Sequence, residues 1–421
     1  MRYPQQRPRK IALGQAATLP LTIAVFVSVV AMQPARAQSY QVIYEFNGNS
    51  GYNPPAGMIF DSAGNLYGTT SAGGGAIDFG TAFELSRSGS GWALSTLHAF
   101  DWNPNQQFSD GADPHAPLVF GPDGSLYGTT GSGGLPASGG TVFELTPSGD
   151  TWTETILYRF TGGADGGEPA SAVTFNQSGN LYGTTSNGGK LRDGTVYELS
   201  PVNGGWRETV IWNFGVFTSD GETPFSNVIL QQGNLYGTTV FGGTGNGTVF
   251  ELVPAATTWR EKVLYRFTGG NDGGNPIAGL IPDHAGNMWG ATSSGGSGGG
   301  GTIFELTPSG SGWEFHLIYS LSGYGGQGGP FANLAFDQAG NLYGTTYADG
   351  ANHVGTVFKL TNSNGNWVYT DLHDFDGTDG EYPESSLTFD ASGTLYGTTN
   401  AGGTGTGCNA TCGVAFEITP Q

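Results

Sequence analysis

The chain has 421 residues, of which 75 are glycine and 37% are hydrophobic. Its 34 acidic residues outnumber its 14 basic ones, which gives a formal net charge of −20 at pH 7. Because proteins bind nucleic acid through basic surfaces, this composition argues against a nucleic-acid partner.

The first predicted element is a secretory signal peptide over residues 1–37. Four basic residues precede an apolar run from Leu21 to Met32, and Ala35-Arg36-Ala37 has the small residues of a cleavage site. The run is too short to cross a bilayer comfortably, and no later stretch approaches the length of a transmembrane helix. Cleavage near Ala37 leaves nine basic residues against 34 acidic ones, a net charge of −25. We therefore expect a secreted or periplasmic protein, with an uncleaved anchor as the alternative.

After a first short strand at residues 42–46, three apolar phrases recur seven times and a fourth, led by tryptophan, recurs six times. The clearest phrase is Leu-Tyr-Gly-Thr-Thr, whose copies recur every 53 to 60 residues. These copies begin at Leu66, Leu126, Leu181, Leu235, Met288, Leu342 and Leu395. Each copy follows a short apolar run such as Gly57 to Phe60 and precedes a Phe-Glu-Leu phrase, which in the first six units is followed by a tryptophan-led phrase. All four phrases have strand length and are bounded by turn residues.

Four strands in each of seven units predict an all-β, seven-bladed β-propeller over residues 38–421. We name the strands A to D in the order of the four phrases. Residues 42–46 match strand D, and the chain ends after strand C of the seventh unit. The first strand is therefore expected to complete the last blade and to close the ring, which removes the exposed sheet edges.

Length variation is confined to two of the four connections. The interval from the strand C aromatic to the next tryptophan is always nine residues, whereas the B-to-C interval runs from 15 to 21 residues. The D-to-A connection lengthens around Trp102 to Asp110. In an up-and-down blade these two connections emerge on one face, so we expect any binding site there.

The D-to-A loops contain a recurring Asp-Gly-x-x-Pro phrase. The aspartate can accept hydrogen bonds from its own turn, which would give the phrase a structural role. Oxygen-rich loops of this kind can also hold calcium. The clustering of Asp376, Asp379 and Glu381 makes this loop the calcium candidate.

Candidate ligand-binding residues are the aromatic residues of the loop face that break the repeat. These are Trp102, Phe108, Tyr324 and Tyr382. The regularly spaced tryptophans are instead predicted to pack between blades. Exposed rings suit contact with a glycan or a peptide, although a loop could also tuck such a ring inward.

The sequence offers little for catalysis. Its six histidines are scattered, without the spacing of a metal-ligand motif. His115 and Asp165 are the catalytic candidates. Among the histidines, His115 and His353 lie on the variable face, and neither has a demonstrable partner. Cys408 and Cys412 are the only cysteines, and in an exported protein we expect them to form a disulfide.

Three phrases together resemble the GloVer tandem repeat of bacterial exported proteins. They are Gly64 to Thr70, Gly247 to Leu252 and Val263 to Gly270, and the resemblance covers nearly all of residues 41–419. It implies an exported repeat protein. Since no sorting tail follows the last strand, we expect a free rather than anchored form. The Gly-Gly pairs after strand B, such as Gly188-Gly189, add a looser similarity to kelch propellers.

Two functions remain open at this point. The preferred one is a noncatalytic, monomeric binding propeller whose variable face holds a glycan, a peptide or an envelope component. The alternative is an extracellular propeller enzyme, a lyase or hydrolase that acts on a polysaccharide or a small molecule, because propellers can build sites from isolated residues of several blades. No cofactor is expected apart from calcium.

Overall fold

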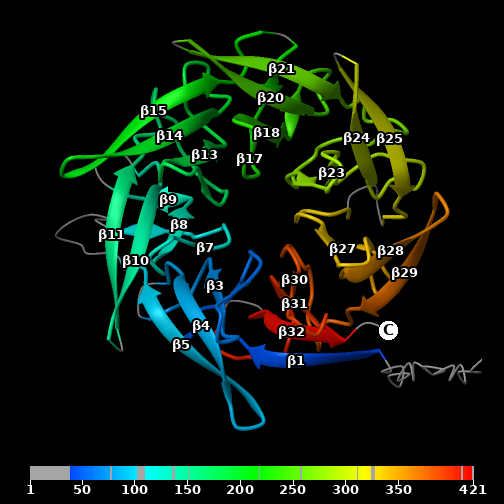
Figure 1. Cartoon of the computed structure of the whole chain (residues 1–421). Helices are drawn as coiled ribbons and strands as arrows, with labels where there is room; N and C mark the ends of the chain where they lie inside the picture. Colours follow the sequence, from blue (N-terminus) through cyan, green and yellow to red (C-terminus); the bar gives the residue numbers. More distant parts are fainter. Residues whose placement is uncertain are drawn as a thin grey trace, which may run out of the picture. The chain divides into compact units, whose positions relative to one another are not determined.

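The computed structural model describes residues 38–75, 78–101, 110–134, 138–149, 151–217, 219–256, 258–310, 312–323, 328–408 and 411–419. Residues 37–421 form one compact unit. Every regular element in the described ranges is a β-strand, and seven four-stranded antiparallel sheets follow one another around a ring (Figure 1). The predicted all-β, seven-bladed propeller is confirmed.

The blades follow the order of the seven repeats, and in each one the strands run from A on the inside to D on the outside. Their bounds are β2 (Ile59–Phe60), β3 (Leu66–Thr70), β4 (Thr81–Ser88) and β5 (Gly91–Ala99) in blade 1; β7 (Val119–Phe120), β8 (Leu126–Thr130), β10 (Thr141–Ser148) and β11 (Thr151–Arg159) in blade 2; β12 (Thr174–Phe175), β13 (Leu181–Thr185), β14 (Thr195–Val202) and β15 (Gly205–Asn213) in blade 3; β17 (Ile229–Gln231), β18 (Asn234–Thr239), β20 (Thr248–Ala255) and β21 (Thr258–Arg266) in blade 4; β22 (Ile281–Pro282), β23 (Met288–Ala291), β24 (Thr302–Ser309) and β25 (Gly312–Ser320) in blade 5; β26 (Ala335–Phe336), β27 (Leu342–Thr346), β28 (Thr356–Ser363) and β29 (Asn366–Asp374) in blade 6; and β30 (Thr388–Phe389), β31 (Leu395–Thr399), β32 (Val414–Thr419) and β1 (Ser39–Glu45) in blade 7.

The glycine of the Leu-Tyr-Gly-Thr-Thr phrase makes room for the strand C aromatic. Gly237 of β18 pairs with Phe250 of β20, and a Cβ atom on Gly237 would lie 2.6 Å from the Phe250 ring. The same contact recurs in all seven blades, at 2.3 to 2.6 Å. The phrase therefore encodes a cavity into which a fully buried ring fits.

The tyrosine of the same phrase packs against the next blade. Tyr67 of blade 1 contacts the edges of Phe120 and Trp152 of blade 2, with ring centroids 5.3 and 6.2 Å apart. Tyr396 of blade 7 contacts Phe60 and Trp92 of blade 1 in the same way. The regularly spaced tryptophans thus lie between blades, as their spacing indicates.

The first strand closes the ring. β1 pairs antiparallel with β32, from Ser39 opposite Thr419 to Glu45 opposite Val414. The strand begins three residues earlier than predicted. The aromatic ring of Tyr40 on this extension stacks on His373 of blade 6 at 3.6 Å. The N-terminal strand therefore binds two blades at once.

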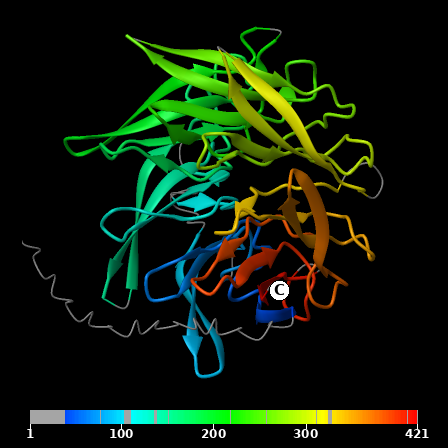
Figure 2. The same ribbon diagram turned by 45° about the vertical axis from the view of Figure 1, so that its right-hand side comes forward.

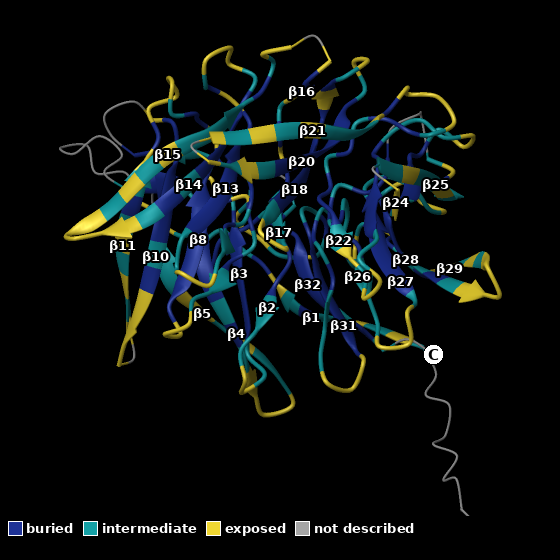
Figure 3. Cartoon of the chain, turned by 45° about the horizontal axis from the view of Figure 1, so that its top comes forward, coloured by how far each residue is buried: buried dark blue, intermediate teal, exposed yellow. Residues whose placement is uncertain are grey.

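The outer C-D hairpins and the variable loops differ in character. Strands C and D lie outermost (Figures 1 and 2), and the hairpin tips are exposed while the inner strands are buried (Figure 3). The D-to-A and B-to-C loops pair with each other in short ladders, such as β6 (Gly111–Ala112) with β9 (Ser132–Gly133) and β16 (Gly221–Glu222) with β19 (Phe241–Gly242). The two variable connections therefore share one face, which we call the loop face.

No helix long and apolar enough to cross a membrane occurs in the part of the chain that the structure describes.

Candidate functional site

The residue before the proline of each D-to-A loop holds two blades together. Its N–H donates to the preceding blade and its C=O accepts from its own blade. The N–H of Asp113 donates to the Phe79 carbonyl at 3.1 Å, and the Asp113 carbonyl accepts from Gly131 N–H at 2.8 Å. In six blades this residue has a φ of 53° to 57°, although it is never glycine there. The six residues are Asn53, Asp113, Glu168, Thr223, Asn275 and Tyr382.

The backbone of this junction is therefore fixed while its side chain is free to differ. A positive φ is unfavourable for a residue with a Cβ atom, and the two hydrogen bonds hold it in place. In the seventh loop Gly329 takes the position, and its carbonyl accepts from Tyr347 N–H at 3.2 Å.

The second residue after each proline is uniform. It is always Ala or Ser, and it is always buried. In six blades its carbonyl accepts a hydrogen bond, at 2.9 to 3.3 Å, from the hydroxyl of the first threonine in the Leu-Tyr-Gly-Thr-Thr phrase of the preceding blade. An example is the bond from Thr129 to Ser171. Blade 5 has Ala291 in place of that threonine and donates no such bond. The segment between the proline and strand A is thus hydrogen-bonded to the preceding blade. Strand A, which follows it, pairs within its own blade over only two or three residues.

The first residue after each proline lines one central pocket with a volume of about 340 Å³, together with the third residue in six of the seven blades. Four of the second-position residues, Ala56, Ser171, Ser226 and Ala332, also line it. The first position contributes Pro55, His115, Ala170, Phe225, Ile277, Phe331 and Glu384. The third contributes Gly57, Pro117, Ala172, Asn227, Asn333 and Ser386. The pocket thus receives side chains from all seven blades, at the point where the D-to-A loops turn into strand A.

The chemistry of the pocket is divided around the ring. Blades 4, 5 and 6 contribute the apolar side chains of Phe225, Ile277 and Phe331, whereas blades 7 and 2 contribute Glu384 and His115. Phe225 is 40% exposed, so its ring is open to a ligand. One arc of the rim is therefore apolar and the opposite arc is polar.

Amide side chains form a network at one side of the pocket. Asn333 of blade 6 donates from Nδ2 to Oδ1 of Asn227 in blade 4 at 3.1 Å. Its own Oδ1 accepts from Gly279 N–H at 2.6 Å, and its N–H donates to the hydroxyl of Ser386 at 3.2 Å. These bonds connect four blades near the axis and order the polar groups of the pocket.

Glu384 and His115 both have perturbed ionisation. Burial raises the pKa of Glu384 to about 7, and its carboxylate has no hydrogen-bond partner among the described residues. Burial lowers the pKa of His115, while the nearby Asp113 opposes this change. The His115 side chain still reaches solvent. The pocket therefore holds one group, Glu384, that titrates near neutral pH.

An aromatic stack adjoins the polar arc. Tyr382 stacks on Tyr347 with ring centroids 4.8 Å apart, and Phe331 contacts the edge of Tyr347 at 4.8 Å. Of the predicted ligand-binding aromatics, Tyr382 thus lies in a ring cluster that reaches the pocket through Phe331. Trp102, Phe108 and Tyr324 lie outside the described residues.

The structure does not bring the two catalytic candidates together at the pocket. His115 lines it, whereas Asp165 does not. The Asp165 carboxylate accepts from Tyr158 O–H at 3.2 Å and from Thr161 N–H at 2.9 Å, and it also accepts from the Thr161 hydroxyl. Asp165 therefore stabilises its own loop.

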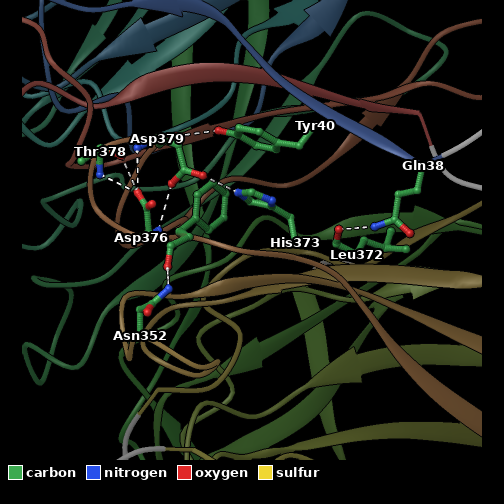
Figure 4. A network of polar contacts seen from close by, with 9 residues as sticks. Gln38, Tyr40, Asn352, Leu372, His373, Asp376, Thr378 and Asp379 are labelled. Carbon is green, nitrogen blue, oxygen red and sulfur yellow. Dashed lines mark hydrogen bonds and ion pairs between the residues drawn. The ribbon is translucent and has the colours of Figure 1, made fainter.

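The carboxylates of two calcium candidates, Asp376 and Asp379, already contact neighbouring protein groups. Asp376 Oδ1 accepts from the N–H and the hydroxyl of Thr378, at 2.9 and 2.7 Å, and Asp379 Oδ2 lies 2.8 Å from His373 Nε2 (Figure 4). Glu381 pairs with Ala401 through its backbone. Calcium at Asp376, Asp379 and Glu381 stays a prediction. Melting temperatures with calcium and with chelator test it, and equal values would contradict it.

A disulfide joins Cys408 to Cys412 in the B-to-C loop of blade 7. The same loop contacts the start of the chain, because Thr404 donates to the Glu45 carboxylate and Gly48 N–H donates to the Thr406 carbonyl at 3.2 Å. The crosslink therefore lies beside the seam at which β1 closes the ring.

Asp220 and Glu261 form a buried acid pair between blades 3 and 4. Burial, followed by hydrogen bonding and repulsion from Asp220, raises the pKa of Glu261 to about 9. Asp220 is 2% exposed, and its Oδ2 and Glu261 Oε1 are both buried without a protein hydrogen-bond donor. Two facing carboxyl groups in this setting must share a proton.

The pair should make the fold less stable as the pH rises. The unfolded chain loses the Glu261 proton near pH 4.5, whereas the folded chain keeps it up to about pH 9. The folded state binds more protons in this window, so the free energy of unfolding falls with pH. We expect Glu261→Gln, which keeps a donor for Asp220, to be more stable than the parent at pH 8 by about 1 kcal/mol and to show a flatter pH profile. Urea unfolding between pH 5 and 9 measures this. Arg260→Gln on the same strand is the charge control, and identical slopes for the parent and Glu261→Gln would contradict the shared proton.

Sequence reasoning missed Phe225, Phe331 and Glu384. It searched for residues that break the spacing of the repeat, whereas these residues keep the spacing and differ only in identity. The available signal was the contrast between two neighbouring positions. The residue directly after the proline changes from blade to blade, while the next one is always Ala or Ser.

Comparison with curated proteins finds no match. Among solved structures, the chain is similar to PorZ, a bacterial surface component of the type-IX secretion system of Porphyromonas gingivalis, at 16% identity and a TM-score of 0.51. That match covers 90% of this chain and 48% of PorZ. An ancestral GH74 enzyme aligns at 13% identity with a TM-score of 0.52, over 88% of this chain and 51% of the enzyme. A putative oxidoreductase (glucose dehydrogenase) from Thermus thermophilus aligns at 14% identity and a TM-score of 0.44, over 91% of this chain and all of that one.

At these identities the structural matches show the fold alone. The family comparison is more specific, because the Gloeobacter/Verrucomicrobia repeat pattern matches residues 27–246 and 232–421. The matched residues include all seven copies of the phrases that gave the resemblance. The chain is therefore a member of the Gloeobacter/Verrucomicrobia repeat family, built as a seven-bladed β-propeller.

Proposed function

We propose that this protein is an exported, noncatalytic binding propeller that holds the end of a glycan in its central pocket. The observation that carries the proposal is the contrast between adjacent positions of the same loop. The buried second position after the proline is Ala or Ser in every blade, whereas the first position presents Pro, His, Ala, Phe, Ile, Phe and Glu, in blade order, to one pocket. A residue with only a folding role would be repeated like its neighbour.

The pocket suits a sugar ring better than a purely apolar ligand. A volume of about 340 Å³ lies at the lower end of the range for small-molecule sites, which is about 300–1,000 Å³. The apolar arc of Phe225 and Phe331 can cover the C–H face of a sugar. Glu384, His115 and the amides of Asn227 and Asn333 can bond to its hydroxyl groups. A peptide end or another envelope component that combines an apolar face with hydrogen-bonding groups is an alternative occupant.

A glycan array with the mature protein, followed by calorimetric titration of the best ligand, tests the proposal. We expect Phe225→Ala and Phe331→Ala each to weaken binding about tenfold or more, because each removes an aromatic contact worth about 1.4 kcal/mol or more. The matched control is Phe241→Ala, since Phe241 is also an exposed loop-face ring, 46% exposed, but lies outside the pocket. Equal affinity in all variants would refute the pocket as the binding site.

Glu384 should make binding depend on pH. Since its pKa is about 7, the carboxyl group changes from a hydrogen-bond donor to an acceptor with a full charge between about pH 6 and 8. We expect the affinity of the parent for its best ligand to change across this range, and the affinity of Glu384→Gln to stay constant. Titration of both proteins at pH 6, 7 and 8 checks this, and parallel pH profiles would contradict it.

A second candidate function is an extracellular lyase or hydrolase. It is favoured by the presence of Glu384 and His115 in one pocket, because an acid with a pKa of about 7 is suited to general acid-base chemistry. A screen of polysaccharide depolymerisation and small-ester hydrolysis distinguishes the two functions. Turnover that Glu384→Gln and His115→Gln both abolish would support the enzyme. Ligand binding without turnover supports the binding propeller.

Export itself is part of the proposal. We propose that the predicted signal peptide over residues 1–37 directs export, and that the mature propeller acts as a monomer in the periplasm or the medium. N-terminal sequencing of the processed protein should give a start near Gln38, and gel filtration with light scattering should give the mass of one chain.

A further inference from the structure

A second cluster of ionisable residues lies far out on the ring, between blades 1 and 2. His98 comes from β5, Asp110 from the loop that enters blade 2, and Glu154 from β11. The Nε2 atom of His98 lies 2.9 Å from Asp110 Oδ2 and 3.7 Å from Glu154 Oε2. Among the described residues, only these three side chains bring three potential metal-ligating atoms within 4.8 Å of one another.

The cluster contains an oxygen that nothing in the protein satisfies. The Oε1 atom of Glu154 is buried and has no hydrogen-bond partner. The Glu154 and Asp110 side chains are each 13% exposed, and that of His98 is 21% exposed. Asp110 Oδ2 also accepts from Asp101 N–H at 3.3 Å, whereas Glu154 Oε1 faces no donor. Two carboxylates offer only acceptors to each other, so this arrangement suits a cation. Arg159 is the nearby positive charge that acts on Glu154.

The side chains of Asp110 and His98 are held in place by their neighbours. Gly111 N–H donates to Asp110 Oδ1 at 2.8 Å, which leaves Oδ2 directed at His98. The imidazole of His98 packs edge-on against the buried ring of Phe100, with centroids 4.9 Å apart. A site whose ligands are oriented before binding loses less conformational entropy when an ion enters.

The other interfaces supply an internal comparison, because the same positions are occupied by other residues. Tyr158 meets Asp165 and Glu208 between blades 2 and 3, and Trp212 occupies the histidine position beside the Asp220–Glu261 pair. Neither position offers a ring nitrogen able to bind a metal.

The interface between blades 6 and 7 has the histidine but lacks the second carboxylate. His373 Nε2 lies 2.8 Å from Asp379 Oδ2, as in the first cluster, but Tyr40 stacks flat on the imidazole, and its O–H donates to the Asp379 carbonyl at 2.6 Å (Figure 4). Histidine and two carboxylates therefore meet only between blades 1 and 2, within the described part of the ring.

We propose that His98 Nε2, Asp110 Oδ2 and a Glu154 carboxylate oxygen bind one divalent transition-metal ion, with Zn²⁺ the ion that best fits a set of one nitrogen and two oxygens. Three protein ligands leave a fourth position for water. The site joins two blades at their outer strands and is independent of the central pocket and its ligand.

Zinc titration of the tag-free mature protein, after removal of metal with EDTA, tests the site. Calorimetry should give one Zn²⁺ per chain. His98→Gln and the isosteric Glu154→Gln should each weaken binding by about 100-fold or more. His373→Gln is the matched control and should leave both stoichiometry and affinity unchanged.

Cobalt gives a readout that a merely structural role would not produce. Co²⁺ added to the metal-free parent and to His373→Gln should generate visible d–d absorption of a low-coordinate site, and Glu154→Gln should abolish it. Circular dichroism and melting curves confirm that each variant is folded. The proposal is overturned if folded parent protein binds no stoichiometric Zn²⁺, if Glu154→Gln binds it as tightly as the parent does, or if His373→Gln loses it as well.

Discussion

A chain that begins at residue 47 is expected to lose the cooperative unfolding transition of a chain that begins at residue 38. The deletion removes all of β1 and leaves β32 as an unpaired edge, because their antiparallel pairing runs from Ser39 to Glu45. It also removes Ile43 and Phe46, which are 9% and 0% exposed and pack with Leu66 and Phe83 of blade 1. The two terminal blades then lose both their common strand and part of their core.

The comparison should be made by thermal melting followed by circular dichroism, with gel filtration to detect aggregates. An exposed strand edge is a template for intermolecular pairing, so we expect the shorter chain to aggregate. A point variant separates packing from hydrogen bonding. Ile43→Asp places a charge in the core and should cost roughly 3 kcal/mol or more. Ser39→Asp, on an exposed position of the same strand, should cost little. A shorter chain that melts at the temperature of the longer one would disprove closure by β1.

Gly237→Ala should be among the most destabilising single-methyl additions in the chain. The new Cβ would lie 2.6 Å from the Phe250 ring, and Phe250 is 0% exposed, so the ring cannot move into solvent. Gly237 has no positive φ, so the cost is steric alone. Overpacking of this kind costs roughly 1–3 kcal/mol, and we expect the upper end because the neighbouring strands are also buried.

Guanidinium unfolding of the parent, Gly237→Ala, Phe250→Leu, their double variant and one control tests this steric origin. Gly205→Ala is the matched control, because its new Cβ meets nothing within 4 Å and its φ is not positive. It should change stability by no more than about 0.5 kcal/mol. Adding Phe250→Leu to Gly237→Ala should recover part of the loss, so that the double variant is more stable than the sum of the single effects predicts. Additive losses would show that the ring contact is not the cause.

The fold could be predicted because the residues that pack together recur at constant spacing in each repeat. Gly237 needs an aromatic ring opposite it, Tyr67 needs the tryptophan of the next blade, and both partners lie at constant spacing in the sequence. The predicted closure also followed from the order of the phrases. The short length of strand A was not predicted, because hydrogen bonds such as Thr129 to Ser171 run between blades and leave no trace in the pattern of one repeat.

The site was only partly predictable for a geometric reason. His115 was selected because it lies on the variable face, and it does line the pocket. Glu384 is 269 residues away from it in sequence, and the ring alone brings the two residues into the same cavity. The same limitation applies to the outer cluster. Nothing in the pattern of one repeat indicates that Glu154 of the next blade faces His98 and Asp110.

The junction before each proline has a consequence for how such proteins diversify. Its backbone is held by two hydrogen bonds from main-chain atoms, so its conformation does not depend on which side chain the blade presents. Seven loops therefore project interchangeable groups from a common frame, and a change in one blade need not disturb the other six. Members of this family can therefore acquire new ligands by single substitutions at the position after the proline, while the backbone of the seven loops stays the same.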